Sequence, residues 1–233
     1  MDNTKIDKFF LLIGFDKIKF VALNKKNEIS INKEFLINDS SLDDNLKSLE
    51  NFLDQNIIKI EDELNNHIKD IYLIINYNDF LTIDMSSISN FKNYVAQPIN
   101  TSNFLNNIKN NLMKNMDGYD LIHVIINKFI IDRKDYSSIP DENNYTDIFL
   151  ELRFIFLKDD IIQNLKSVLS KYQISVKNIS SYKYVDGFEN LEKKNIFSLA
   201  YQLSNGFNEK EIMLINKPTK NIGFFEKFFN FFN

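Results

Sequence analysis

Few side chains in this sequence are of the types that carry out catalytic chemistry. The chain contains 2 His and no Cys, which excludes disulfides, thiolate metal sites and a cysteine nucleophile. His67 falls near the expected end of a helix, and His123 falls within an apolar strand. No acidic motif with metal-binding spacing lies between them. We therefore expect neither histidine to bind a metal or to act in catalysis.

The acidic clusters are explained by helices better than by acid–base chemistry. Asp159 and Asp160 stand where a helix is expected to begin, and carboxylates are favourable at that end of a helix. The acidic runs at 43–44 and 61–63 fit the solvated face of another helix. The sequence contains no phosphate-binding G-x-x-x-x-G-K-S motif and no Ser/His/Asp arrangement. We expect a protein that is not an enzyme.

An unusually aromatic stretch occupies residues 220–233. A helix turns by about 100° per residue, which places the apolar residues of this stretch on one half of the cylinder. We predict an amphipathic helix that lies on the cytoplasmic membrane surface, with Lys220 and Lys227 as its basic residues. Its membrane-binding face would consist of Ile222, Phe224, Phe225, Phe228, Phe229, Phe231 and Phe232. Docking of this face on the rest of the chain, or in a partner's groove, are the two alternatives.

The composition is that of an ordinary globular chain. Hydrophobic residues make up 44% and charged residues 26% of the 233 residues, enough for one large domain or two small ones. A net charge of −4 with interspersed signs argues against a nucleic-acid partner. The apolar run at 9–15 is too short to span a membrane and fits a buried strand better than a signal peptide. The expected compartment is the cytoplasm.

Hydrophobic periodicity predicts an α/β chain. The first part is typical of three strands, a helix and a strand, at residues 9–15, 17–24, 28–37, 40–68 and 71–75. A second block predicts a strand, a helix and two strands, at residues 80–89, 101–116, 121–131 and 147–157. The last part predicts a helix at residues 159–172 and a strand at 174–179. A helical piece that ends at residue 187 follows, and then a helix at 191–203. A linker with a short ordered segment precedes the terminal helix.

The order of these elements resembles the N-terminal half of FtsA, the actin-like family of bacterial cell-division proteins. Residues 121–132, LIHVIINKFIID, are similar to the family's H-V-I-P-x-x-Y-x-(I/V)-D strand, and residues 172–179 and 195–203 are similar to a later strand and the last core helix. The aromatic stretch stands where FtsA carries its membrane-targeting helix. The resemblance implies an actin-like (ribonuclease-H-like) subdomain at 1–78 and 159–206, an inserted strand-helix-strand-strand (SHS2-like) subdomain at 79–158, a linker at 207–219 and a membrane-targeting helix at 220–233.

The nucleotide site of the family is altered in this sequence. The family's first phosphate loop is D-x-G-T-(T/S)-K, and the corresponding residues here are Leu12, Gly14, Phe15, Asp16 and Lys17, with Ile13 at the variable position. Leu12 and Phe15 offer no ligand to Mg²⁺ and no donor to phosphate. The second actin-like half, with its phosphate loop and adenine pocket, has no counterpart between about Asp186 and Leu191. We expect no cofactor, no metal, no ATP binding and no ATPase activity.

The resemblance implies an FtsA-like division scaffold at the cytoplasmic face of the bacterial inner membrane. Residues 79–158 correspond to the part that contacts later division proteins. A contact with FtsZ is in doubt, because the family makes it through a subdomain of the missing half, and the family's filaments also need that half; another oligomer stays possible. The alternative is a PilM-like pilus or secretion assembly module that binds the cytoplasmic tail of a membrane protein. A degenerate kinase-like enzyme is a third reading, which Leu12 and Phe15 disfavour.

Overall fold

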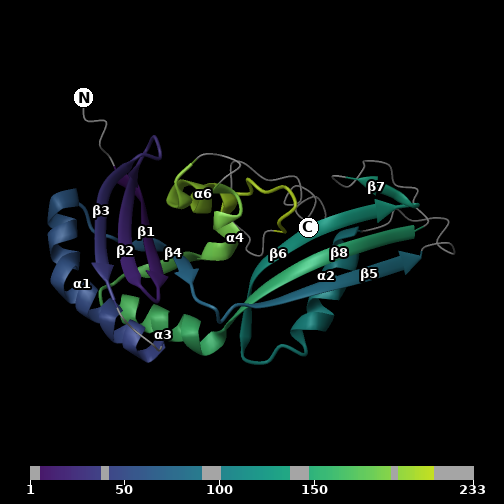
Figure 1. Ribbon diagram of the computed structural model, residues 1–233, viewed down its shortest axis with the longest axis horizontal. Helices are drawn as coiled ribbons and strands as arrows, with labels where there is room; N and C mark the ends of the chain where they lie inside the picture. Colours follow the sequence, from purple (N-terminus) through teal and green to yellow (C-terminus); the bar gives the residue numbers. More distant parts are fainter. Residues whose placement is uncertain (1–5, 38–41, 91–100, 137–146, 190–193, 213–233) are drawn as a thin grey trace. The chain divides into compact units, whose positions relative to one another are not determined.

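The computed structural model describes residues 6–37, 42–90, 101–136, 147–189 and 194–212 (Figure 1). The chain folds into two compact units. Unit 1 contains the described residues up to Phe80 and those from Lys158 to Ser204, and unit 2 contains those from Leu81 to Leu157 and from Asn205 onward. The predicted terminal helix at 220–233 and the linker residues 213–219 lie outside the described residues.

Unit 1 is built on a five-stranded mixed sheet with the order β3-β2-β1-β4-β9. Its strands are β1 (Ile6–Gly14), β2 (Lys17–Asn24), β3 (Ile29–Leu36), β4 (Asp70–Asn76) and β9 (Ser175–Ser181). The first three strands pair antiparallel, whereas β4 runs parallel to both β1 and β9. The centre of the sheet is covered on both faces, so β1 and β4 need continuous apolar runs rather than an alternating pattern.

Helices cover both faces of this sheet (Figure 1). One face carries α1 (Leu42–Leu64) and α3 (Asp159–Ser170), which contact each other. The opposite face carries α4 (Tyr182–Asp186) and α6 (Ile196–Leu203), where Phe197 and Leu203 pack against Phe10 of β1 and Tyr72 of β4. Helix α6 begins at a genuine N-cap, because the Asn195 side chain accepts a hydrogen bond of 2.8 Å from the Ser198 amide.

Unit 2 is a four-stranded antiparallel sheet with one helix. The strand order is β5-β8-β6-β7, formed by β5 (Leu81–Asn90), β6 (Tyr119–Ile131), β7 (Lys134–Tyr136) and β8 (Asp147–Lys158). Helix α2 (Thr101–Met113) packs Leu105 and Ile108 into a buried cluster with Leu152 and Phe154 of β8. On the long pairing of β5 with β8, Arg153 forms a double ion pair with Asp84, at 2.7 and 2.8 Å.

The predicted α/β fold class is confirmed: unit 1 contains a five-stranded mixed sheet with helices, and unit 2 contains a separate antiparallel sheet. The predicted end of α1 at residue 68 was too late. The helix ends at Leu64 because Asn65 takes a left-handed conformation (φ 48°) and the Asn66 amide bonds back to the Glu61 carbonyl. Helix α6 starts at Ile196 rather than at 191, although residues 190–193 lie outside the described part.

Between the strands predicted at 121–131 and 147–157, the structure has a further short strand, β7. Asp132 and Arg133 both have positive φ, 47° and 69°, and they form the two-residue turn between β6 and β7. Such turns match the twist of antiparallel strands and normally select Asn-Gly or Asp-Gly. The Asp132 side chain also accepts a hydrogen bond of 2.9 Å from the Asp147 amide, which ties the turn to the start of β8.

Candidate functional site

The loop after β1 is the first candidate site, because the carboxyl ends of parallel strands meet there. Gly14 lies opposite Asn76 at the end of β4, in parallel register. A Cβ atom on Gly14 would lie 3.6 Å from Asn76 Cβ, an ordinary van der Waals distance, and 3.2 Å from Asp16 Oδ1, a contact that a small shift of the Asp16 side chain relieves. Gly14 thus lies at the turn between β1 and β2, at a position that does not require glycine.

The two altered loop positions are occupied by packed apolar side chains. Leu12 is 4% exposed and belongs to the cluster under α4 and α6. The Phe15 ring lies 4.8 Å, centroid to centroid, from the Tyr77 ring just after β4. Neither position presents a carboxylate or a hydroxyl where a nucleotide-binding loop needs one. Lys17 is already in β2, paired with Leu36 of the edge strand β3.

One carboxylate of this loop acts on a phenol that follows β9. Burial raises the pKa of the Tyr182 phenol, with further contributions from the carboxylates of Asp186 and Glu189. Asp16 acts in the same direction more weakly, which places its carboxylate within electrostatic range of the same phenol.

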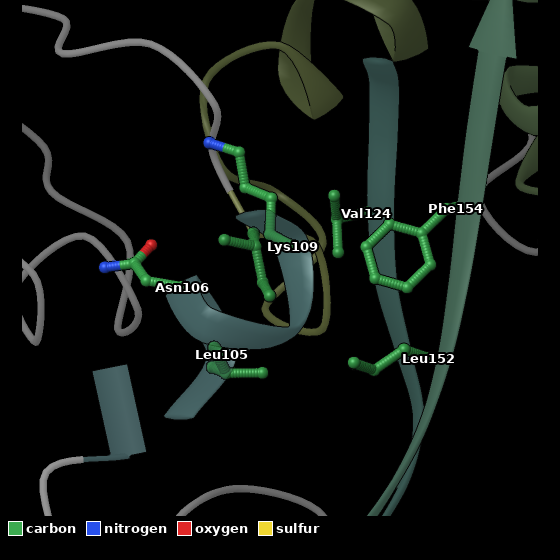
Figure 2. A pocket seen from close by; sticks show the side chains of 7 residues that line it. Leu105, Asn106, Lys109, Val124, Leu152 and Phe154 are labelled. Atoms are coloured by element: carbon green, nitrogen blue, oxygen red, sulfur yellow. The ribbon is translucent and has the colours of Figure 1, made fainter. Parts of the chain in front are cut away.

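Unit 2 contains a pocket between α2 and its sheet (Figure 2). Its lining consists of Leu105, Asn106 and Lys109 of α2, Val124 of β6, Leu152 and Phe154 of β8, and Ile212. The cavity measures only about 10 Å³, room for about one water molecule and far below the size usual for small-molecule sites. The side chains that line it, Ile212 included, therefore leave no room for a substrate.

The side of β6 next to this pocket is paired with the segment that follows α6. We call residues 208–212 the clasp. The Ile126 amide donates to the Lys210 carbonyl and the Ile212 amide donates to the Val124 carbonyl, each at 2.8 Å. Between these two bonds, Glu211 and Ile125 form an antiparallel bridge. The clasp thus adds a very short strand to unit 2, where the sequence predicts a linker.

A buried pair of ionisable side chains joins the clasp to β6. His123 Nδ1 lies 2.6 Å from Glu211 Oε1, and the two side chains are only 5% and 9% exposed. Sequence reasoning assigned no role to His123 and did not single out Glu211, although a histidine on an apolar strand needs a buried polar partner. Residues 88 positions apart are thus brought together.

The other ionisable residues considered from the sequence have structural roles. His67 is largely exposed and contacts Glu61 at 3.1 Å, beyond the end of α1. Asp159 and Asp160 form the first turn of α3, as predicted. Within the described residues no group of three or more His, Asp or Glu side chains could hold a metal ion. No described helix is long and apolar enough to cross a membrane, and all the predicted membrane-binding residues lie outside the described part.

Comparison with known proteins gives structural similarity only. No protein-family model matches the chain, and no curated protein matches its sequence. The cytoplasmic domain of EpsL, an inner membrane component of the type II secretion system of Vibrio cholerae, is similar at 9% identity and a TM-score of 0.39, over 76% of this chain and 58% of that chain. The PilM–PilN type IV pilus biogenesis complex is similar at 7% identity and a TM-score of 0.49, over 87% of this chain and 52% of that chain.

A third similar structure is a protein of Bacteroides thetaiotaomicron with an actin-like ATPase fold. It has 13% identity and a TM-score of 0.34, and the match covers 82% of this chain and 59% of that one. The chain thus spans between 52% and 59% of the length of these structures. Similarity at this identity concerns the fold and assigns neither a partner nor an activity.

Proposed function

We propose that this protein is a noncatalytic, actin-like scaffold module of a membrane-associated assembly, and that it binds a cytoplasmic segment of a membrane protein. This is the alternative to the division scaffold that the sequence analysis named. The observation that carries the proposal is the loop after β1. There, Leu12 is part of the core and Phe15 packs on Tyr77, at the positions where an actin-like enzyme would hold Mg²⁺ and phosphate.

The packing of unit 2 supports the binding part of the proposal. Its sheet carries a helix on one face, and the edge of β6 binds the extended clasp, whose Ile212 packs in the buried cluster between α2 and β8. Sites of this kind recognise peptides through backbone hydrogen bonds and one or two side-chain pockets. A small-molecule substrate would need a larger enclosed volume and convergent polar groups.

The names of the similar structures suggest which partners to test. EpsL is described as an inner membrane component of a secretion system, and PilM is described in complex with PilN. The partner class proposed for this chain is accordingly the cytoplasmic tail of a membrane protein in a pilus or secretion apparatus. No nucleic acid is proposed as a partner, because the net charge of the chain is −4.

An FtsA-like division scaffold is the second candidate. The sequence from 220 to 233 favours it, because an amphipathic helix with this aromatic face could attach the chain to the cytoplasmic membrane surface. In this reading residues 79–158 would contact downstream division proteins. Reversible attachment by one helix would need several copies acting together to become firm.

Binding to synthetic peptides separates the two candidates. The cytoplasmic tails of membrane proteins encoded beside this gene are labelled and titrated with the full chain, and fluorescence anisotropy is recorded. The proposal predicts that one tail from a pilus or secretion protein binds in the micromolar range and that a scrambled version of it does not. Binding only to tails of division proteins would reject the pilus or secretion role and support the division scaffold.

A further inference from the structure

The edge of β6 at residues 124–126 offers backbone groups that a strand can bind. The Val124 carbonyl and the Ile126 amide point to the same side of the strand, where they bond to residues 212 and 210. These bonds involve only backbone atoms of the incoming segment, so they do not depend on its sequence. Any extended segment that offers a backbone carbonyl and, two residues later, a backbone amide could form these two bonds.

Among the described residues, the backbone of the clasp pairs with this edge at a single bridge. It forms one isolated bridge rather than a full ladder, and the chain reaches it through Gly206, which has a positive φ of 82°. Asn208 shapes the approach, since its side chain accepts from the Lys210 amide at 3.1 Å and its carbonyl accepts from the Glu211 amide at 2.9 Å. A short segment bound in this way competes with a free peptide for the edge of β6 mainly because it is covalently attached. The attachment gives it an effective concentration in the millimolar range.

Two side chains give the site its selectivity. Successive residues of an extended strand point to opposite faces. On one face, Glu211 reaches the buried His123 at 2.6 Å. On the other face, Ile212 is 8% exposed and belongs to the buried cluster between α2 and β8. A segment with an acidic residue followed directly by an aliphatic residue satisfies both requirements, whereas losing the carboxylate beside His123 or leaving a gap at the position of Ile212 would be costly.

We propose that the edge of β6 is an exchangeable peptide-acceptor site that residues 208–212 keep closed, and that its ligand is an extended partner segment in which an acidic residue precedes an aliphatic one. The identity of that segment as part of a membrane protein's cytoplasmic tail rests on the proposed function. The existence of the site does not, because the chain supplies a ligand sequence of its own. Partner binding would then release the segment that leads toward the terminal aromatic stretch.

The experiment uses the full chain and a labelled peptide with the sequence of residues 206–213, GFNEKEIM. The Ile212→Asp variant weakens the clasp, because it places a carboxylate against the apolar pocket. Fluorescence anisotropy should show that the peptide binds Ile212→Asp at least about tenfold more tightly than the wild-type chain, in which the attached clasp competes. Ile58→Asp, at an exposed position of α1, is the matched control and should behave as wild type.

Hydrogen exchange gives a second readout. The Ile126 amide should exchange faster in Ile212→Asp than in the wild type, and added peptide should restore its protection. If circular dichroism shows that Ile212→Asp is unfolded, Glu211→Ala replaces it as the weakened variant. A peptide carrying Asp in place of its Ile must bind more weakly.

Three results would overturn the proposal. The first is absence of peptide binding to a folded weakened variant, and the second is equal binding of the Asp-substituted peptide. The third is dimerisation of the weakened variant at rising concentration, which would show that the edge pairs with a second copy instead. Failure of all membrane-protein tails to bind, with the GFNEKEIM peptide still bound, would reject the proposed function alone.

Discussion

The burial of Leu12 predicts that this residue of the loop after β1 has a structural role. Its side chain is 4% exposed and packs in the cluster under α4 and α6, whereas Phe15 is 37% exposed. We predict that Leu12→Ala lowers the free energy of unfolding by about 2–5 kcal/mol, as for other buried large-to-small changes. Phe15→Ala should cost clearly less. Urea unfolding followed by circular dichroism measures both, and equal effects would contradict this account of the loop.

The Asp84–Arg153 pair predicts a weak acid dependence of stability. The hydrogen bond from Arg153 lowers the pKa of the Asp84 carboxyl. A lowered folded-state pKa means that the pair stabilises the fold above the unfolded pKa of about 3.9 and that this contribution disappears as the pH falls through the lower folded value. Both side chains are about half exposed, so the effect should stay below about 1 kcal/mol.

Thermal unfolding of wild type and Asp84→Asn measures this contribution. The difference in midpoint between the two should be present at pH 7 and shrink as the pH falls below the unfolded pKa of Asp84, because protonation of this carboxyl removes the ion pair. A difference in unfolding midpoint that stays unchanged at the lowest pH would show that Asp84→Asn destabilises the β5–β8 pair by something other than loss of the ion pair.

At the scale of elements, the clasp depends on the His123–Glu211 pair. We predict that Glu211→Ala destabilises the fold by about 1–3 kcal/mol, because it leaves a buried imidazole without its carboxylate partner. Glu209→Ala, two positions earlier in the exposed part of the clasp, is the matched control and should change stability by less than about 0.5 kcal/mol. Similar losses in both variants would mean that the pair has no special role.

Helix α6 provides a second test at this scale. Asn195→Ala removes the side chain that accepts from the Ser198 amide, and we predict a loss of about 0.5–2 kcal/mol. Asn195→Asp keeps an acceptor at the same position and should retain most of the stability. Chemical denaturation compares the three proteins, and failure of Asp to rescue would show that the loss does not come from the cap.

Some of these elements could be predicted from the sequence and others could not. The long strands β1 and β6 and helix α3 were predictable, because continuous apolar runs and helical spacing identify them without tertiary information. The turn at Asp132 and Arg133 was missed, since neither residue is the glycine that usually marks a positive-φ turn. The clasp was missed because its bridge to Ile125 and the contact of Glu211 with His123 join residues that lie far apart in the sequence.

At the scale of the whole molecule, the aromatic stretch at 220–233 predicts attachment to lipid. We expect the full chain to sediment with anionic liposomes and a chain ending at Pro218 to stay in the supernatant, because burial of Phe side chains drives such attachment. The shorter chain keeps all described residues, so its fold is the internal control. Retention of both chains in the supernatant would favour docking of the aromatic face on protein.

The central proposal is that this chain works as a scaffold and not as a nucleotide enzyme. Isothermal titration of the full chain with Mg-ATP tests it most directly, with the same protein checked for folding before and after. The proposal predicts no saturable heat, because Leu12 and Phe15 supply neither a metal ligand nor a phosphate donor. A dissociation constant in the micromolar range would contradict it.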